Sequence, residues 1–434
     1  PKGMLEDIPT YIRGYEPLNF SKQYMGMVPA NEALAMSLNV PAVRLLQQYG
    51  ILPFKEKLID AGITTLHYSP DYYGLPLVLG GAEVKLWDIC GAYASMGRIL
   101  AHTYTFDHRY LKEDIHPPVL YRFPGEDKSV SDKNATEVNA PVWNVGAIWQ
   151  TFEAMSTLRR PDQEGQWETF ESSKRIAWKT GTSFGFRDAW AVGITPKYTI
   201  GVWIGNADGE GRPGVIGLHA AAPILFDVLR MLDSKDEWWN PPYDALKPIV
   251  ICAQSGWIAG PNCTKTDTAY IVDGEQMPKM CSYHQQIYTN PDHTYRFDPN
   301  CQDETTSLEN YFVVPTLAES YYKRYHPEYQ TVPPWSPACA QAQHSEKDLA
   351  IIYPRPGSKI YVPYEWDKKK SKAVFSAVTR FENEDVYWHL DQEYIGKTHE
   401  FHQIEIDPKP GKHVLVLQDE YGGMASAAFE VLTK

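Results

Sequence analysis

Hydrophobic positions follow a helical period in the first hundred residues of the chain. In residues 30–49 an apolar stripe that includes Leu34, Leu38 and Leu45 recurs every three or four positions, as on one face of an α-helix. The stripe breaks at residues 39–41, where Asn39 is a favourable helix N-cap and a proline suits the first turn. Residues 83–100 predict another helix, and the polar residues 101–140 predict an excursion over the surface.

Strand-like runs follow at residues 175–182, 188–194 and 198–205. The short turns between them predict an antiparallel meander. Apolar residues occupy both faces of the second and third runs, so we expect layers on both sides of this sheet, one of them a helix over residues 220–232.

The rest of the chain changes character twice. Residues 233–345 are rich in Pro, Tyr and Asn with weak periodicity, which predicts an irregular connector. Beyond them, seven short strand-like runs separated by turn signals predict an immunoglobulin-like sandwich, at residues 349–353, 359–362, 374–381, 386–390, 401–406, 413–418 and 427–432. We therefore predict an α+β fold with three parts: a mixed domain over 1–232, a cysteine-containing connector over 233–345 and an all-β domain over 346–434.

Composition narrows the classes of function. The net charge of −13 argues against a protein that tracks nucleic-acid phosphates, which would need a basic face. It also disfavours electrostatic adhesion to anionic lipid. The sequence contains no apolar run of about 18 residues that could span a membrane and no signal peptide. Because the chain opens on Pro1, we expect a further segment upstream.

Five of the six cysteines fall between residues 252 and 339. Such clustering in a loop-rich segment predicts disulfides and an oxidising compartment, and the pairing stays open. The alternative is a zinc site formed by Cys252, Cys263, Cys281 and His284. Because their spacing contains no Cys-x-x-Cys pair, the prediction favours disulfides and includes no metal and no cofactor.

Lys179, Thr180, Gly181 and Thr182 form the most informative short motif. A cation with hydroxyls near the end of a strand can bind a substrate carboxylate, and a glycine lets a ligand backbone lie close. An ordinary strand, with threonines present for β-propensity, is the alternative.

A second motif is Ser37-Leu38-Asn39, at the helix break. Helix capping accounts for Asn39 but leaves Ser37 unexplained. Together the two motifs follow the pattern of penicillin-binding serine acyltransferases, which combine Ser-x-x-Lys, Ser-x-Asn and Lys-Thr-Gly.

The resemblance extends over nearly the whole chain. EALAMSLNVPAVRLL (32–46), LGGAEVKLWDICGAY (79–93) and IAWKTGTSFGFRDAWAVGITPKYTIGVWIGN (176–206) resemble bifunctional class A penicillin-binding proteins, of the penicillin-binding protein 1C subfamily. The last 90 residues or so resemble the C-terminal β-sandwich of that subfamily. The resemblance implies a periplasmic D,D-transpeptidase, anchored to the inner membrane, that cross-links peptidoglycan stem peptides through a serine acyl-enzyme and binds β-lactams.

Residue roles are implied by the same resemblance. Ser37 would relay a proton to the leaving amine, Asn39 would orient the substrate amide, and Lys179 would set the local electrostatics; these are the catalytic candidates. Thr180, Gly181 and Thr182 would bind the substrate, and the backbone N–H of Thr182 would donate to the oxyanion.

The nucleophile motif is missing from its expected place. Ser320 and Lys323 form the one Ser-x-x-Lys match, but they follow the other motifs and lie in the connector, so we set them aside. In the family the motif lies upstream of the segment that opens this chain, after a glycosyltransferase domain. We therefore expect an upstream segment that carries both, and we expect this chain alone to be inactive and to form no penicillin adduct.

Two other functions stay open. One is a non-catalytic module that binds peptidoglycan or envelope proteins through aromatic residues of the sandwich, namely Tyr387, Trp388 and Tyr394. The alternative for Trp388 is a core position. The other function is a D,D-carboxypeptidase that shares the motifs.

Overall fold

The computed structural model describes residues 1–12, 15–105, 114–121, 143–157, 175–232, 237–302, 304–339, 348–362, 372–420 and 422–432. Two compact units are present. Unit 1 consists of residues 1–2, 30–249 and 268–277, and unit 2 consists of residues 3–29, 250–267 and 278–434. The division into three domains at residues 232 and 345 stays a prediction, and most of the polar stretch 101–140 lies outside the described residues.

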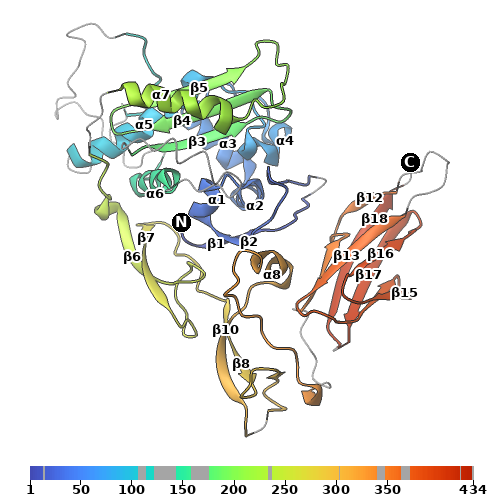
Figure 1. The fold of residues 1–434 in the computed structure, drawn as a ribbon. Coiled ribbons are helices and arrows are strands. Elements are labelled where there is room, and N and C mark those ends of the chain that lie inside the picture. The colour runs from blue at the N-terminus through green and yellow to red at the C-terminus, as the bar shows by residue number, and fades with distance from the viewer. Residues whose placement is uncertain are drawn as a thin grey trace. The chain divides into compact units, whose positions relative to one another are not determined.

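A three-stranded antiparallel sheet forms the centre of unit 1 (Figure 1). Its strands are β3 (Ala177–Thr182), β4 (Asp188–Ile194) and β5 (Thr199–Gly205), in that order. The register pairs Ala177 with Ile194 and Thr182 with Ala189. The predicted meander is therefore present, with β3 at one edge of the described sheet.

Helices cover both faces of this sheet, as the apolar pattern predicted. Helix α7 (Ala222–Met231) packs Leu225, Phe226 and Leu229 on one face. On the other face, α5 (Leu86–Thr105) and α6 (Val145–Ser156) pack against Ala177 and Ile194. A π-helical turn, Gly217–Ala221, leads into α7.

The predicted helix over residues 30–49 is two helices, α1 (Ala30–Ala35) and α2 (Asn39–Tyr49). Residues 36–38 separate them, so the break lies just before residues 39–41, where the sequence placed it, and residues 39–41 form the first turn of α2. Helix α3 (Ile51–Asp60), the single turn α4 (Pro70–Tyr73) and a 3₁₀ turn (Leu75–Leu79) follow. A separate apolar cluster that includes Leu46, Leu66 and Leu77 holds these helices together.

The N-terminal hairpin belongs to unit 2. Strands β1 (Met4–Asp7) and β2 (Gly26–Pro29) pair antiparallel and pack on α8 (Thr316–Tyr322) through an apolar cluster. Gly26 has a φ of 76°, and a Cβ there would lie 2.3 Å from the carbonyl oxygen of Ala318. Only glycine fits, because both the backbone conformation and the space exclude a side chain.

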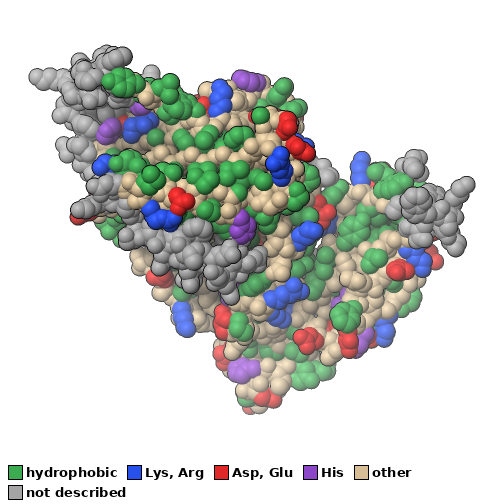
Figure 2. Space-filling model, turned by 45° about the horizontal axis from the view of Figure 1, so that its top comes forward, with side chains coloured by type: hydrophobic (Ala, Val, Ile, Leu, Met, Phe, Trp, Pro, Cys, Tyr) green, Lys and Arg blue, Asp and Glu red, His purple; other side chains and the backbone are tan. Residues whose placement is uncertain are grey.

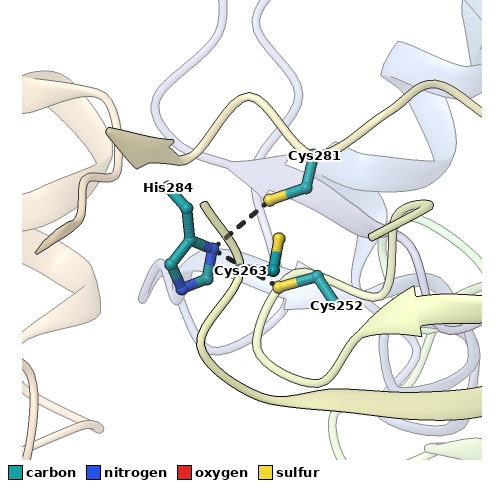
Figure 3. A group of neighbouring side chains, drawn as sticks. All are labelled: Cys252, Cys263, Cys281 and His284. Carbon is teal, nitrogen blue, oxygen red and sulfur yellow. Dashed lines mark hydrogen bonds between the residues drawn. The ribbon is translucent and has the colours of Figure 1, made fainter. Parts of the chain in front are cut away.

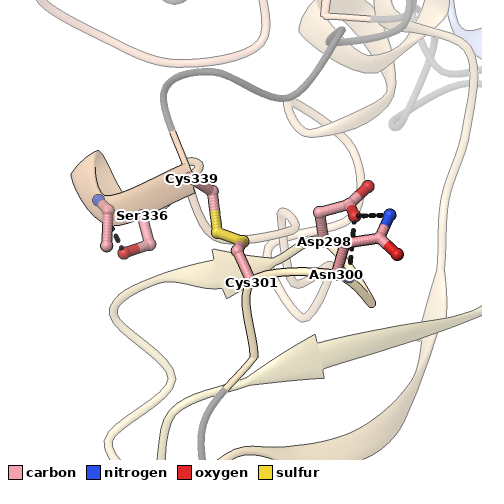
Figure 4. The surroundings of a disulfide bond; sticks show 6 residues. Asp298, Asn300, Cys301, Ser336 and Cys339 are labelled. Carbon is pink, nitrogen blue, oxygen red and sulfur yellow. Dashed lines mark hydrogen bonds between the residues drawn. A yellow bond between two sulfur atoms is a disulfide. The ribbon is translucent and has the colours of Figure 1, made fainter.

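The connector contains more regular structure than its weak periodicity predicted. Strands β6 (Leu246–Cys252) and β7 (Thr266–Val272) pair with each other. A second sheet has the order β10 (Ser307–Phe312), β8 (His284–Thr289), β9 (Arg296–Phe297), and 3₁₀ turns span Tyr243–Ala245 and Pro337–Cys339. A disulfide joins Cys301 to Cys339 (Figure 4), so the prediction of disulfides in this stretch is confirmed for one pair.

The C-terminal part is the predicted β-sandwich. One sheet has the order β11 (Leu349–Tyr353), β13 (Ala373–Thr379), β16 (Gln403–Ile406). The other has the order β12 (Lys359–Tyr361), β18 (Met424–Leu432), β17 (Gly411–Asp419), β14 (Val386–Leu390), β15 (Glu393–Thr398). Each of the seven predicted runs overlaps a strand, and β15 is the strand that the pattern missed. The predicted fold class is confirmed.

Trp388 lies in the core of the sandwich. It is fully buried beside Phe375, Leu415 and Leu417, and its indole N–H donates to Thr398 Oγ1 at 2.8 Å. The core interpretation of this tryptophan is therefore correct, which removes it from the aromatic surface that a binding module would need.

On the face drawn in Figure 2, Lys and Arg side chains are interspersed with Asp and Glu and form no continuous basic surface. Among the helices of the described residues, none is both long and apolar enough to cross a membrane.

Candidate functional site

The turn between α1 and α2 presents Ser37 in a strained conformation. Its φ is 57°, in the left-handed region that side chains with a Cβ rarely adopt. Backbone bonds fix the turn: Ser37 N donates to Leu34 O at 3.1 Å, and Leu38 N donates to Ala33 O at 3.0 Å. Strain of this kind persists where the surrounding structure imposes it and often marks functional sites.

Lys179 reaches this serine from the sheet. Its Nζ donates to Ser37 Oγ at 2.6 Å, although 142 positions separate the two residues in sequence. The same ammonium donates to the carbonyl oxygen of Thr180 at 2.7 Å. The structure thus brings together one residue from each of the two motifs.

Alternation along β3 separates the four residues of the strand motif. Successive side chains of a strand point to opposite faces, so Lys179 and Gly181 share one face and the two threonines share the other. Thr180 is only 6% exposed, so its side chain is buried on the face that α7 covers, where Trp178 contacts Phe226. Thr182 is half-buried, and its Oγ1 accepts a hydrogen bond from Gly217 N at 3.0 Å.

The two glycines at this edge differ in the space around them. A Cβ on Gly181 would make only an ordinary contact, 3.6 Å from Trp190 Cβ. A Cβ on Gly217 would lie 2.4 Å from Gly181 O and 2.7 Å from Trp190 O. Gly181 is therefore open to a ligand, whereas Gly217 is packed directly on the strands. Sequence reasoning missed Gly217; the closely spaced glycines at 211, 214 and 217 before an apolar helix were the available signal.

Asn39 is the first residue of α2, and Leu38 occupies the N-cap position. The capping explanation for Asn39 is therefore not supported. Asn39 lies two positions after Ser37, at the end of α2 that meets the turn, and is half-buried. Its proposed contact with a substrate amide stays a prediction.

The remaining Ser-x-x-Lys match lies elsewhere. Ser320 belongs to α8 in unit 2, and Lys323 Nζ forms an ion pair with Glu319 at 3.0 Å. This lysine is therefore held by a carboxylate, which agrees with setting the match aside.

A second polar group lies in unit 2. The ligand atoms of Cys252, Cys263, Cys281 and His284 all lie within 4.8 Å of one another. These are the residues of the zinc alternative, and the disulfide uses none of them.

Comparison with known proteins shows similarity both in the C-terminal sandwich and over a longer stretch of the chain. A sequence model of the Penicillin-Binding Protein C-terminus Family matches residues 338–429. Penicillin-binding protein 1C of Escherichia coli K12 is 31% identical over 293 residues, which cover 66% of this chain and 34% of that protein. Penicillin-binding protein 4 of Bacillus subtilis is 29% identical over 224 residues, which cover 49% of this chain and 31% of that protein.

Among solved structures, penicillin-binding protein 1A of Haemophilus influenzae matches with a TM-score of 0.46 and 18% identity, over 64% of this chain and 46% of that chain. This chain spans about a third of the length of the two curated relatives. The predicted resemblance to the penicillin-binding proteins, and to penicillin-binding protein 1C among them, is confirmed.

Proposed function

We propose that this chain forms one wall of the catalytic cleft of a peptidoglycan D,D-transpeptidase that reacts through a serine acyl-enzyme. The contact between Lys179 and Ser37 is the observation that carries the proposal. It joins two of the three motifs that this class of enzyme combines. The coarser similarity to penicillin-binding proteins supports it.

Lys179 prepares Ser37 to give up a proton. Because the ammonium donates to Ser37 Oγ, the hydroxyl proton of Ser37 is free to point toward a leaving amine. The positive charge also favours negative charge that develops nearby in the transition state. Ser37 thus acts as a proton relay, and Lys179 supplies the local positive potential.

Thr182 suits the recognition of a substrate carboxylate. Its Oγ1 already accepts from Gly217 N, which leaves its own O–H to donate to a ligand. Thr180 is buried and is a weaker candidate for this contact than the sequence predicted. In the described part of unit 1, β3 is an edge strand, so a stem peptide could add to it as an extended strand beside the open Gly181.

The serine nucleophile is supplied by a Ser-x-x-Lys motif that this cleft wall does not carry. We therefore place this chain in a periplasmic class A enzyme. In that enzyme an upstream segment carries both the glycosyltransferase domain and the nucleophile. Without that serine, only binding and transition-state stabilisation remain. The chain alone binds stem peptides and β-lactams without forming a covalent adduct.

Equilibrium binding of an acyl-D-Ala-D-Ala peptide to the 434-residue chain tests the proposal. Loss of a charged hydrogen-bond donor costs about 1.5–3 kcal/mol, so Lys179→Met should weaken binding about tenfold or more. Lys197→Met is the matched control, because Lys197 is an exposed lysine in the turn between β4 and β5 of the same sheet. Equal affinity of the Lys179→Met chain and the unmodified chain would contradict the proposal.

Intact-mass spectrometry after incubation with penicillin tests whether the chain alone forms a covalent adduct. We expect the mass of the chain to stay unchanged. A mass increase equal to one penicillin would show that a serine within these residues is acylated, and the assignment of the nucleophile to another segment would then be wrong.

A further inference from the structure

We propose that unit 2 contains a structural zinc site formed by Cys252, Cys263, Cys281 and His284 (Figure 3). This inference is independent of the cleft in unit 1. It replaces the expectation of no metal, because the fold brings together four ligands that are spread over 33 positions of the sequence.

Distances between the ligand atoms match a tetrahedral ion. A Zn²⁺ with bonds of about 2.3 Å to sulfur and about 2.0 Å to nitrogen holds sulfur and nitrogen about 3.5 Å apart. His284 Nδ1 lies 3.5 Å from Cys252 Sγ and 3.5 Å from Cys281 Sγ. Cys263 Sγ lies within 4.8 Å of each of these atoms. In Figure 3 the three sulfurs and Nδ1 point toward a common centre.

The histidine is held in the tautomer that a metal requires. Its Nε2 lies 2.9 Å from Gln254 Oε1. Because an amide oxygen only accepts, Nε2 carries the proton and the lone pair of Nδ1 faces the sulfurs. A hydrogen bond from the far ring nitrogen of this kind orients metal-bound histidines and raises their basicity.

Backbone amides support the thiolates. Ser255 N donates to Cys252 Sγ at 3.4 Å, and Gly260 N donates to Cys263 Sγ at 3.3 Å. Such N–H donors stabilise negative charge on sulfur. Each comes from a tight turn: Gly256 N bonds to Cys252 O at 2.9 Å, and Cys263 N bonds to Gly260 O at 3.1 Å.

Burial indicates a structural rather than a catalytic site. Cys252, Cys281 and His284 are 0%, 8% and 5% exposed, and Cys263 is half-buried. Four protein ligands fill a tetrahedral shell and leave no position for a substrate or water. Binding requires the three thiols to lose their protons to solvent, so the bound form carries a net charge of −1 when the histidine is neutral.

The site would fasten three separate pieces of chain. Cys252 ends β6, Cys263 lies in the β6–β7 loop, and Cys281 and His284 lie just before and at the start of β8. The N-terminal hairpin also attaches here, because Met4 N donates to Ser255 O at 2.9 Å. Zinc would therefore stabilise both the connector and the docking of residues 3–29.

Metal analysis of the purified 434-residue chain tests the site directly. We expect about one equivalent of zinc, lost in Cys252→Ser and kept in Cys90→Ser, the control that removes the free cysteine outside the cluster. Failure of the chain to retain zinc after dialysis against excess Zn²⁺ would overturn the proposal. A disulfide between any two of Cys252, Cys263 and Cys281 in non-reducing peptide mapping would overturn it as well.

Cobalt substitution keeps the test decisive where Cys252→Ser fails to fold. Cys263 is the most exposed of the four ligands, so Cys263→Ser should preserve the fold best. Loss of one thiolate of three should lower the sulfur-to-cobalt charge-transfer absorbance by about a third. An unchanged spectrum in Cys263→Ser would exclude Cys263 from the site and contradict the four-ligand arrangement.

Discussion

The cleft residues of unit 1 and the thiol cluster of unit 2 differ in how deeply they are buried. In unit 1 a well-covered sheet leaves Lys179, Gly181 and Thr182 accessible at its edge. In unit 2 three of the four zinc ligands are almost completely buried. Unit 1 has large apolar clusters on both faces of its sheet, whereas the connector of unit 2 combines a smaller apolar cluster with a disulfide, the thiol cluster and buried ion pairs. In unit 1 the polar groups lie at the edge of a sheet that apolar clusters cover, whereas in unit 2 sulfur atoms and charged groups link segments of the connector.

Removal of the metal should give the largest difference in stability between the two units. Structural zinc contributes on the order of 10 kcal/mol in small domains, which is comparable to the whole stability of a typical domain. We expect a strong chelator to expose the connector to proteolysis near Cys252 and Cys281 while unit 1 stays protected. Equal protection of both units with and without chelator would show that the cluster does not hold the connector.

The buried ion pairs of unit 2 give the next largest effect. Arg380 is 5% exposed; it forms an ion pair with Glu319 and donates from Nε to Asp348 Oδ1 at 2.9 Å. Removing one partner of a buried network costs about 3–5 kcal/mol, because the remaining charges stay buried. Arg380→Ala should lower the free energy of unfolding of unit 2 by that amount in urea titration.

An exposed pair in the same sandwich is the control for Arg380. Lys372 lies 3.6 Å from Glu405, and both side chains are mostly exposed. Lys372→Ala should change stability by less than about 1 kcal/mol. Similar losses for Arg380→Ala and Lys372→Ala would mean that the buried network does not stabilise the connector.

Substitutions of Gly181 and Gly217 test whether a ligand binds at the exposed edge of the sheet in unit 1. Gly217→Ala would place a Cβ 2.4 Å from Gly181 O, and crowding of this kind costs about 1–3 kcal/mol. Gly181→Ala meets no such obstacle, so its stability should change by less than about 0.5 kcal/mol while its affinity for an acyl-D-Ala-D-Ala peptide falls. Unchanged peptide affinity in Gly181→Ala would show that the ligand backbone does not lie against this residue.

A pH dependence of unit 2 is the smallest predicted effect. Burial first, and then the nearby Asp419 and Asp348, raise the pKa of Glu384 from 4.5 to about 8. The folded state therefore holds a proton that the unfolded state releases above pH 4.5. This stabilising contribution is complete below pH 4.5 and is lost as the pH rises through about 8.

Glu384→Gln should flatten that pH dependence, because glutamine stays neutral throughout. Urea titrations of unit 2 between pH 5 and 9 (about the window set by the raised pKa) would measure the change. Glu405→Gln, at an exposed position, is the control. A slope that persists in Glu384→Gln would assign the dependence to another group.

Local patterns in the sequence predicted most of the regular structure. β4 (Asp188–Ile194) and β11 (Leu349–Tyr353) have the predicted bounds, because a strand's alternation and its turns are written in adjacent residues. Pairings between distant segments were not visible. β8 pairs with β10 across residues 290–306, whose pattern is weak, and residues 3–29 belong to unit 2 rather than to unit 1, which contains the three-stranded sheet.

The candidate sites show the same difference between signals in adjacent residues and contacts between distant ones. Resemblance to a family, rather than spacing, linked Ser37 to Lys179. Gly217 was missed because its role depends on a contact across the sheet edge. For zinc, the signal was Cys281-Ser282-Tyr283-His284, a tight Cys-x-x-His pair in which histidine takes the place of a second cysteine. The sequence therefore offered the zinc site as an alternative but favoured disulfides, because the four residues contain no Cys-x-x-Cys pair.

Coupling between Ser37 and Lys179 tests the account of the cleft most directly. Binding of the acyl-D-Ala-D-Ala peptide should be measured for Ser37→Ala, Lys179→Met and the double variant. Residues in contact are non-additive, so the double variant should bind about as weakly as Lys179→Met alone, with a coupling energy of about 1 kcal/mol or more. Fully additive losses, or no loss in either single variant, would contradict a shared role for the two residues in the cleft.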